Sequence, residues 1–233
     1  MAGILFIISA PSGSGKSTLV NELLRLVKGL EFSVSYTTRG PRGSEREGRE
    51  YHFISREKFE AMIAAGEFLE YAEVFGHFYG TAGHTLDDAA ARGCDLLLDI
   101  DVQGAVQVKK KRADSVSIFI LPPSRQILEK RLRNRSMSEG AVDDKVIELR
   151  LQEARKEIEN SPDYDYSLVN ERLEEAVDHL SSIVLAERAT RSGRELAADE
   201  QRAVAIAKLC SQRSGPNRKL KAIMDSFGQA VPY

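Results

Sequence analysis

The sequence predicts an α/β protein built on a parallel sheet. Several short runs have consecutive rather than alternating apolar residues, which indicates strands that are covered on both faces. Helical stretches separate these runs, and strands that alternate with helices favour a parallel sheet. The chain of 233 residues is long enough for one sizeable domain with attached lobes. The pattern leaves the order of the strands in the sheet open.

The expected strands and helices alternate along most of the chain. Strands are expected at residues 4–9, 95–100, 117–121 and 166–170. Helices are expected at about 16–28, 84–92, 102–112, 124–134, 141–160 and 171–190. In the last helix Leu173, Val177, Leu180 and Val184 recur at spacings of four, three and four, so they form one apolar face.

Three segments depart from this alternation. Between about 33 and 83 the chain is first polar, basic and Gly-rich, and then "FLEYAEVFGHFYGTA" alternates as short antiparallel strands do. An inserted lobe of small strands and one helix (56–65) is the simplest explanation. "RLRNRSMSEGAVDD" (131–144) is charged and lacks an apolar face, which predicts a mobile surface segment. Beyond about 190 we expect one helix (196–211) and a short amphipathic piece.

Composition excludes several classes of protein. With 33 basic and 35 acidic side chains the net charge is -2, which argues against nucleic-acid binding over the whole surface. No stretch is long enough to span a bilayer, and the apolar start lacks the basic region of a signal peptide. Cys94 and Cys210 show no pairing pattern, and the four histidines have no metal-ligand spacing. We expect a cytoplasmic protein without nucleic-acid or membrane partners.

The first predicted strand runs into "SAPSGSGKST", which fits the phosphate-loop pattern G-x-x-x-x-G-K-[ST] except that Ala10 replaces the first glycine. Gly13 and Gly15 allow the backbone to close around a phosphate. Lys16 would reach the β- and γ-phosphates, and the Ser17 hydroxyl would bind Mg²⁺. The alternative is a chance Gly/Ser turn before a capped helix, but the strand-to-helix position favours a nucleotide site. The candidate ATP-binding residues are Ala10, Pro11, Ser12, Gly13, Ser14, Gly15, Lys16, Ser17 and Thr18.

Two arginines in the inserted lobe are candidates for a second anion site. Arg39 and Arg42 lie three residues apart in a Pro/Gly loop, where both can point at one anion. A solvated basic loop is the alternative. The hydroxyls of Tyr36, Tyr51 and Tyr79 in the same lobe favour the anion site.

Together, "SYTTRGPRGSEREGREYHF", "FLEYAEVFGHFYGT", "LLLDIDVQGA", "SAPSGSGKST" and "IFILPPS" resemble the bacterial type of guanylate kinase over residues 3 to about 190. The resemblance implies a P-loop NTPase fold with a central parallel sheet, an inserted small mixed α/β lobe that binds GMP, and a helical lid. It implies a guanylate kinase-like domain at 1–190, with the core at 1–33, 84–130 and 151–190. The lobe would be 34–83 and the lid about 131–150. Residues 191–233 would be a C-terminal helical extension without a counterpart in shorter members of the family.

The resemblance also assigns a GMP site. It places the GMP phosphate at Ser35, Arg39, Arg42, Tyr51 and Tyr79, and the guanine at Glu70, Thr81 and Asp101. Guanine presents adjacent N1–H and N2–H₂ donors, which one ionised carboxylate at Glu70 can accept. Adenine would leave that carboxylate unpaired, at a cost of about 1–3 kcal/mol or more. A surface charge on a strand is the alternative for Glu70.

Two carboxylates follow the strand "LLLDID". Asp99 and Asp101 lie at its C-terminal end, where open α/β sheets bind ligands, and alternation puts both on one side. We expect Asp99 to serve Mg²⁺, directly or through water, and Asp101 to face the acceptor. A helix-capping role for Asp101 remains open.

The arginines at the predicted lid match those of the family. Arg131, Arg133 and Arg135 lie in "RLRNR", and Arg150 follows the irregular segment. Guanidinium groups can stabilise the charge on the transferred phosphoryl group, and with Lys16 we expect Arg135 and Arg150 to be the catalytic residues. For Arg133 a solvated helix face is the alternative. The segment between Arg135 and Arg150 is a few residues longer than the usual lid of the family.

The leading hypothesis is therefore reversible, Mg²⁺-dependent transfer of the ATP γ-phosphoryl group to GMP in purine nucleotide metabolism. One alternative is the catalytically silent guanylate-kinase-like binding module of scaffold proteins, which the intact Gly15, Lys16 and Ser17 oppose. Another is a kinase for a different nucleoside monophosphate, which Glu70 and Thr81 oppose. The oligomeric state, monomer or homodimer, stays open. So does the extension, which could pack as a helix, mediate self-association or stay mobile.

Overall fold

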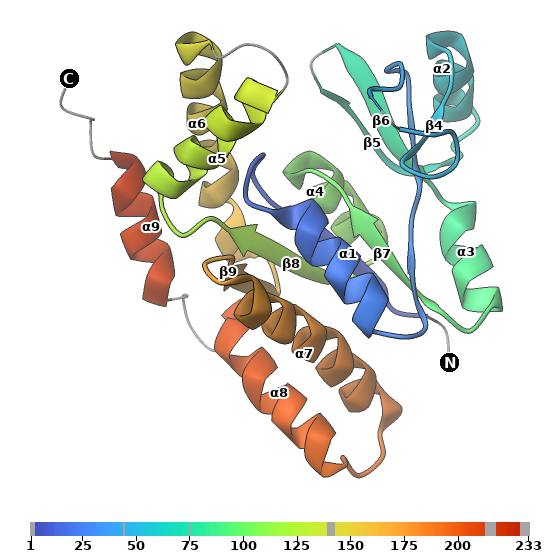
Figure 1. The fold of residues 1–233 in the computed structure, drawn as a ribbon. Coiled ribbons are helices and arrows are strands. Elements are labelled where there is room, and N and C mark those ends of the chain that lie inside the picture. The colour runs from blue at the N-terminus through green and yellow to red at the C-terminus, as the bar shows by residue number, and fades with distance from the viewer. Residues whose placement is uncertain (1–2, 44, 75, 139–142, 213–217, 229–233) are drawn as a thin grey trace. The chain divides into compact units, whose positions relative to one another are not determined.

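The computed structural model describes residues 3–43, 45–74, 76–138, 143–212 and 218–228. They divide into a first unit, with residues up to Ile7 and Gly29–Val116, and a second unit, with Ile8–Lys28 and the chain from Ser117 on. A larger sheet has five strands and a smaller sheet has four (Figure 1). In spatial order the larger sheet consists of β2 (Leu30–Phe32), β7 (Asp95–Asp99), β1 (Leu5–Ser9), β8 (Val116–Leu121) and β9 (Tyr166–Val169).

The larger sheet confirms the predicted fold class. β2 pairs with β7 in parallel, and β8 pairs with β9 in parallel. Every residue of β1 and of β8 is buried, as the consecutive apolar runs predicted. The strand β2 was not predicted, because "LEF" is three residues long with a charged residue at its centre and so carries no recognisable pattern.

The inserted lobe belongs to the first unit and has its own sheet. Its spatial order is β4 (Tyr51–Phe53), β3 (Ser35–Thr37), β6 (His77–Ala82) and β5 (Phe68–Val74), with helix α2 (Arg56–Ala64) as the only helix between its strands in the described chain. β5 and β6 are antiparallel, as expected. The ring of Phe59 in α2 is fully buried and stacks on Phe68 at 4.3 Å and on Phe78 at 5.2 Å between ring centroids. This aromatic stack gives the lobe a core of its own.

The remaining helices confirm the predicted alternation, with ends that shift by a few residues. The first unit adds α3 (His84–Ala91) and α4 (Val102–Lys111). The second unit contains α1 (Lys16–Leu26), α5 (Arg125–Ser138), α6 (Asp144–Glu159), a short 3₁₀ turn (Ser161–Asp163) and α7 (Leu173–Ser192).

The prediction of a mobile surface segment at 131–144 was wrong for its first part, because α5 continues to Ser138. Leu128, Leu132 and Ser136 are buried at intervals of four residues along this helix. Leu132 is the one buried apolar side chain at 131–137, so the segment carried no apolar periodicity that would have extended the predicted helix. Residues 139–142 of the predicted mobile segment lie outside the described residues.

The C-terminal extension forms two helices in the second unit. α8 (Ala198–Cys210) packs along α7, and Ser211 then forms an antiparallel bridge with Tyr166 of β9 (Figure 1). α9 (Arg218–Gly228) packs against α5 and α6, with Ile223 and Phe227 buried. Of the three possibilities for the extension, packing as additional helices is the one observed. Across the described ranges, no helix is long and apolar enough to cross a membrane.

Candidate functional site

The predicted phosphate loop is a tight turn between β1 and α1. The Ser14 amide donates to the Pro11 carbonyl over 3.0 Å, and Gly13 and Gly15 both have a φ of 87°. A side chain at Gly15 would be strained by this φ, and its Cβ would also lie 2.3 Å from Nδ2 of Asn170. The glycine that precedes Lys16 is therefore required by the geometry of the loop.

The first turn of α1 is built to bind an anion. Gly15 is the N-cap and offers no side-chain cap, and the turn holds no acidic residue. Backbone N–H groups at such a helix start have no partner within the helix, and the helix dipole adds positive potential. Ser17 and Thr18 are exposed at this end. The motif and the local geometry agree on a phosphate site.

Two residues of the second unit hold the loop from outside, and the sequence analysis assigned neither to it. The Ser14 carbonyl accepts hydrogen bonds from Asn170 Nδ2 at 2.8 Å and from Arg131 Nη1 at 3.2 Å. Arg131 Nη2 also donates to the Asn170 carbonyl, at 3.1 Å. Burial lowers the pKa of the Arg131 guanidinium. Asn170 follows β9, so a polar residue at the carboxyl end of a predicted strand was the available signal.

In the first unit, the structure brings three of the predicted anion-site residues together. Arg39 is 7% exposed, its Nε donates to Tyr79 Oη at 3.1 Å, and its guanidinium lies 5.3 Å from the centre of the Tyr51 ring. The rings of Tyr51 and Tyr79 meet edge to face at 5.8 Å. Burial raises the pKa of Tyr51, so its hydroxyl stays protonated as a donor.

Glu45, which the sequence analysis did not assign to the site, links both arginines. Its carboxylate accepts from Arg39 Nη1 at 2.9 Å and Nη2 at 3.1 Å, and from the Arg42 amide at 2.8 Å. The bond to Arg39 holds the pKa of Glu45 below its usual range. The Arg42 side chain itself is exposed. An acid three residues after Arg42 in an arginine-rich loop was the signal for this link.

The predicted guanine residues meet around a buried carboxylate. Glu70 in β5 is 3% exposed, and Thr81 Oγ1 in β6 donates to Glu70 Oε1 at 2.7 Å. Ser35 Oγ lies 3.5 Å from Thr81 Oγ1. Burial raises the pKa of Glu70 to about 7, the Thr81 bond opposes this rise, and the negative charge of Asp101 adds to it. The alternative reading of Glu70 as a surface charge does not fit this burial.

Asp101 has the capping role that was left open. Its Oδ1 accepts from the Gly104 amide at 2.8 Å, and so it is the N-cap of α4. This bond places the Asp101 carboxylate next to Glu70, close enough to act on its pKa. Capping and a role beside the guanine site are therefore compatible.

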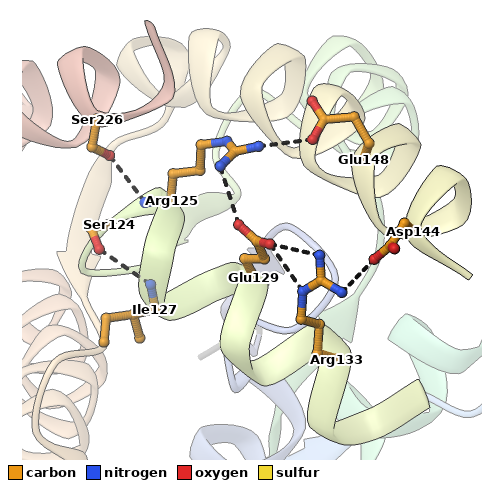
Figure 2. A network of polar contacts seen from close by, with 8 residues as sticks. All are labelled: Ser124, Arg125, Ile127, Glu129, Arg133, Asp144, Glu148 and Ser226. Carbon is orange, nitrogen blue, oxygen red and sulfur yellow. Dashed lines mark hydrogen bonds and ion pairs between the residues drawn. The ribbon is translucent and has the colours of Figure 1, made fainter. Parts of the chain in front are cut away.

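The predicted lid arginines lie in different environments. Arg133 forms ion pairs with Glu129 at 2.9 Å and Asp144 at 2.6 Å, which join α5 to the start of α6 (Figure 2). Arg135 is exposed on α5. Arg150 Nη1 on α6 is buried, and no described residue accepts a hydrogen bond from it. A buried guanidinium nitrogen without an acceptor is suited to a phosphate oxygen supplied by a ligand.

The predicted metal ligands are a hydroxyl and a carboxylate on two different elements. Ser17 is exposed in the first turn of α1, and Asp99 is half-buried at the end of β7. Among the described residues no three His, Cys, Asp or Glu side chains cluster as a metal site. An ion bound here would need most of its ligands from the nucleotide and water.

A groove of about 640 Å³ lies elsewhere in the second unit, between the end of α1 and α7. Leu26, Leu173 and Leu185 line it with Arg25 and Arg188. It explains why Leu173, on the predicted apolar face of α7, is 44% exposed. None of the predicted site residues is among the described residues that line it.

Comparisons with known proteins identify a family for the chain. The sequence model of the family "Guanylate kinase" matches residues 3–187. The chain is 59% identical over 231 residues to the guanylate kinase of Koribacter versatilis, which covers 99% of this chain and 98% of that protein. It is 49% identical over 186 residues to the guanylate kinase of Geobacter metallireducens, covering 80% of this chain and 90% of that one.

The structure is also similar to a crystal structure of guanylate kinase from Anaplasma phagocytophilum. The TM-score is 0.65 at 39% identity, and the match covers 80% of this chain and 86% of the other. Family model, relatives and solved structure thus all indicate one family. The chain belongs to the guanylate kinase family.

Proposed function

We propose that the protein transfers the γ-phosphoryl group of ATP to GMP, reversibly and with Mg²⁺, giving ADP and GDP. The observation that carries this proposal is the buried Glu70 carboxylate, which receives one bond from Thr81 and keeps acceptor capacity for a ligand. An ionised carboxylate buried in a lobe needs donors, and guanine supplies two adjacent ones. Adenine, which lacks both, would leave the carboxylate under-satisfied.

The phosphate of GMP would bind in the same lobe, at Arg39, Tyr51 and Tyr79. The guanidinium of Arg39 is already desolvated and aligned, so it can form charge-assisted bonds with little reorganisation. Ser35 and the exposed, reorientable Arg42 would complete the set. The phosphate would compete with the Glu45 carboxylate for Arg39, and Glu45 keeps the guanidinium oriented until GMP arrives.

The phosphates of ATP would bind at residues 10–18, at the backbone N–H groups of the loop and at Lys16. Asn170 and Arg131 hold the Ser14 carbonyl and so keep the loop in its anion-binding conformation. Arg135 and Arg150 would neutralise charge on the γ-phosphoryl oxygens as the bond to the leaving group breaks. The lid arginines need no proton transfer for this role, since guanidinium groups stay charged.

Mg²⁺ fits the residues present, because it prefers hard oxygen ligands and keeps several waters. The Ser17 hydroxyl, exposed at the start of α1 in the second unit, and the Asp99 carboxylate at the end of β7 in the first unit are each a donor of this kind. When bound, the ion would supply positive charge that stabilises the negative charge of the phosphates.

The same observations favour this function over its alternatives. A silent binding module would not need Gly13 and Gly15 in the left-handed conformation beside an intact Lys16. A kinase for another monophosphate would not need a buried acceptor such as Glu70.

Both cysteines are free thiols, which suits the reducing cytoplasm, and we propose that compartment. ATP and GMP are the proposed partners, in a monomer or homodimer.

An acceptor assay tests the function most simply. With Mg·ATP and GMP, AMP, UMP or dTMP in turn, GMP should be the preferred acceptor by at least about a hundredfold in kcat/KM, because the unpaired Glu70 penalises the others. ADP formation in a coupled assay measures this. The Lys16→Ala variant, purified in the same way, is the control for contaminating kinases: it should lose transfer and still bind GMP. Preference for AMP would refute the guanine assignment, and no turnover with any acceptor would favour the silent module.

The pKa of Glu70 predicts a pH dependence of GMP binding. The ionised form of Glu70 binds guanine. With a pKa of about 7, ionisation of the carboxyl is nearly complete at pH 8, and only a small fraction of it is ionised at pH 6. The Kd for GMP, measured by calorimetry, should therefore rise about tenfold from pH 8 to pH 6. The GMP phosphate also titrates in this range, so Glu70→Gln serves as the matched control and should show a smaller rise. An equal rise in both proteins would contradict the assignment.

A further inference from the structure

Helix α4 lies against the strand that carries Glu70, and one face of it contacts that strand at three successive places. Gly104, Gln107 and Lys111 are spaced by three and four residues, so they line one face of α4. We call these three residues the α4 face. β5 is an edge strand of the small sheet, and its outer backbone groups have no neighbouring strand.

The α4 face supplies the partners that the edge strand lacks. The Gln107 side chain accepts from the Tyr71 amide at 3.2 Å and donates to the Tyr71 carbonyl at 2.7 Å, as a neighbouring strand would. Lys111 Nζ donates to the carbonyls of Phe68 at 3.1 Å and Leu69 at 2.8 Å. These bonds fix β5 on both sides of Glu70.

The contact with Lys111 falls on an irregularity in the strand. The pairing of β5 with β6 shifts between Phe68 and Glu70, so Leu69 is an extra residue. A bulge of this kind re-aims the next side chain, and it leaves backbone groups without ladder partners. Lys111 binds two of the carbonyls at this bulge. It therefore stabilises the local conformation that directs Glu70 toward Thr81.

Gly104 leaves the space beside α4 that the Glu70 carboxylate occupies. A Cβ at Gly104 would lie 2.5 Å from Glu70 Oε2 and 3.1 Å from its Cδ, well inside van der Waals contact. Gly104 is buried in the first turn of α4, and its amide is fixed by Asp101. The helix cannot move away from an added methyl group without straining the bonds of Gln107 and Lys111 to β5. The carboxylate would have to move.

We propose that the α4 face is a positioning element for guanine selection, which holds the Glu70 carboxylate where it accepts both donors of guanine. The proposal rests on the proposed function and adds residues that do not touch the substrate. The residues of the α4 face act differently. Gly104 leaves room for the Glu70 carboxylate, while Gln107 and Lys111 fix the strand that carries Glu70.

Gly104→Ala in the full chain separates positioning from stability. Alanine is the better helix former, so a purely structural role predicts an unchanged or higher melting temperature and normal kinetics. We expect the KM for GMP to rise about tenfold or more, the preference for GMP over IMP (which lacks the 2-amino group) to fall, and the KM for ATP to stay unchanged. Val106→Ala, at an exposed position of the same helix, is the control.

A double-variant cycle identifies the clash. Glu70→Asp is one methylene shorter, so the added methyl group should cost less in the Glu70→Asp background than in the wild type. Additive effects, or wild-type GMP kinetics in Gly104→Ala, would overturn the proposal. If Glu70→Gln itself left the KM for GMP unchanged, the guanine assignment would fail first, so the two failures are distinguishable.

Lys111→Met gives a second test that does not depend on the folding of the glycine variant. It keeps the length of the side chain and removes both bonds to the bulge. We expect it to raise the KM for GMP and to lower the preference for GMP over IMP. Lys110→Met is the matched control, since Lys110 is the exposed neighbour. Equal kinetics for the two methionine variants would overturn the role of Lys111.

A separate observation concerns α9, which lies outside the residues that the family model matches. Ile223 and Phe227 are buried, and the Ser226 hydroxyl accepts from the Arg125 amide at 3.0 Å, at the start of α5 (Figure 2). The Arg125 guanidinium then bonds Glu129 on α5 at 3.1 Å and Glu148 on α6 at 2.8 Å. α9 thus holds Arg125, which joins α5 to α6. These two helices carry Arg131, Arg135 and Arg150.

We infer that α9 is a positioning element for the lid arginines, an inference that also rests on the proposed function. The replacement Ser226→Ala removes the acceptor of the Arg125 amide, and Ile223→Ala with Phe227→Ala weakens the packing. In the full chain these changes should lower kcat several-fold while the Kd for GMP, which binds in the other unit, stays unchanged. Lys221→Ala and Asp225→Ala, on the exposed side of α9, are the controls.

Hydrogen exchange shows whether α9 has detached from α5 in these variants. Exchange at the Arg125 amide should become faster in Ser226→Ala and in the Ile223→Ala, Phe227→Ala variant, and not in the controls. Faster exchange at Arg125 with wild-type kcat would overturn the inference. A fall in the affinity for GMP would overturn it as well, because it would mean a general loss of structure.

Discussion

The structure of the acceptor lobe depends on one buried carboxylate. Glu70 lies in an edge strand with 3% of its surface exposed, and its pKa of about 7 results mainly from the loss of water. Because this pKa is higher than that of a carboxyl in the unfolded chain, the ionised form costs folding free energy, a cost that develops as the pH rises toward 7 and then stays constant. The lobe limits this cost with the Thr81 hydroxyl, and a ligand with two adjacent donors would offset more of it. The proposed selectivity for the base and the folding cost of the ionised carboxylate therefore have the same physical origin.

The two candidate anion sites would attract an anion by different means. The loop before α1 uses main-chain groups, which carry no net charge and need two glycines in the left-handed conformation. The Ser14 carbonyl of this loop is held by Asn170 and Arg131. The site in the lobe uses a buried guanidinium, which needs a counter-charge, and Glu45 provides it. The first site therefore depends on backbone conformation, while the second depends on a competition between two anions for Arg39.

The sequence predicted the features that depend on neighbouring residues or on a regular pattern of apolar residues along the chain. The consecutive apolar residues of β1 and β8 predicted buried strands, and the alternation in "FLEYAEVFGHFYGT" predicted β5 and β6. The continuation of α5 to Ser138 was missed, because the residues after Leu132 are mostly polar or charged. Glu45, Asn170 and Gln107 were missed for another reason. Each acts as a lone polar residue that bonds one or two partners, and a lone polar residue has no period that a sequence can reveal.

The central claim is that the Glu70 carboxylate is held in a dry site whose natural occupant is a hydrogen-bond donor pair. The titration of the Glu70 side-chain carboxyl, followed by carbon NMR in the free protein and with saturating GMP, tests it most directly. We predict an apparent pKa near 7 in the free protein, and a value well below its usual range with GMP bound, since the guanine donors favour the charged form. A pKa that GMP leaves unchanged, or an ordinary value in the free protein, would contradict the account.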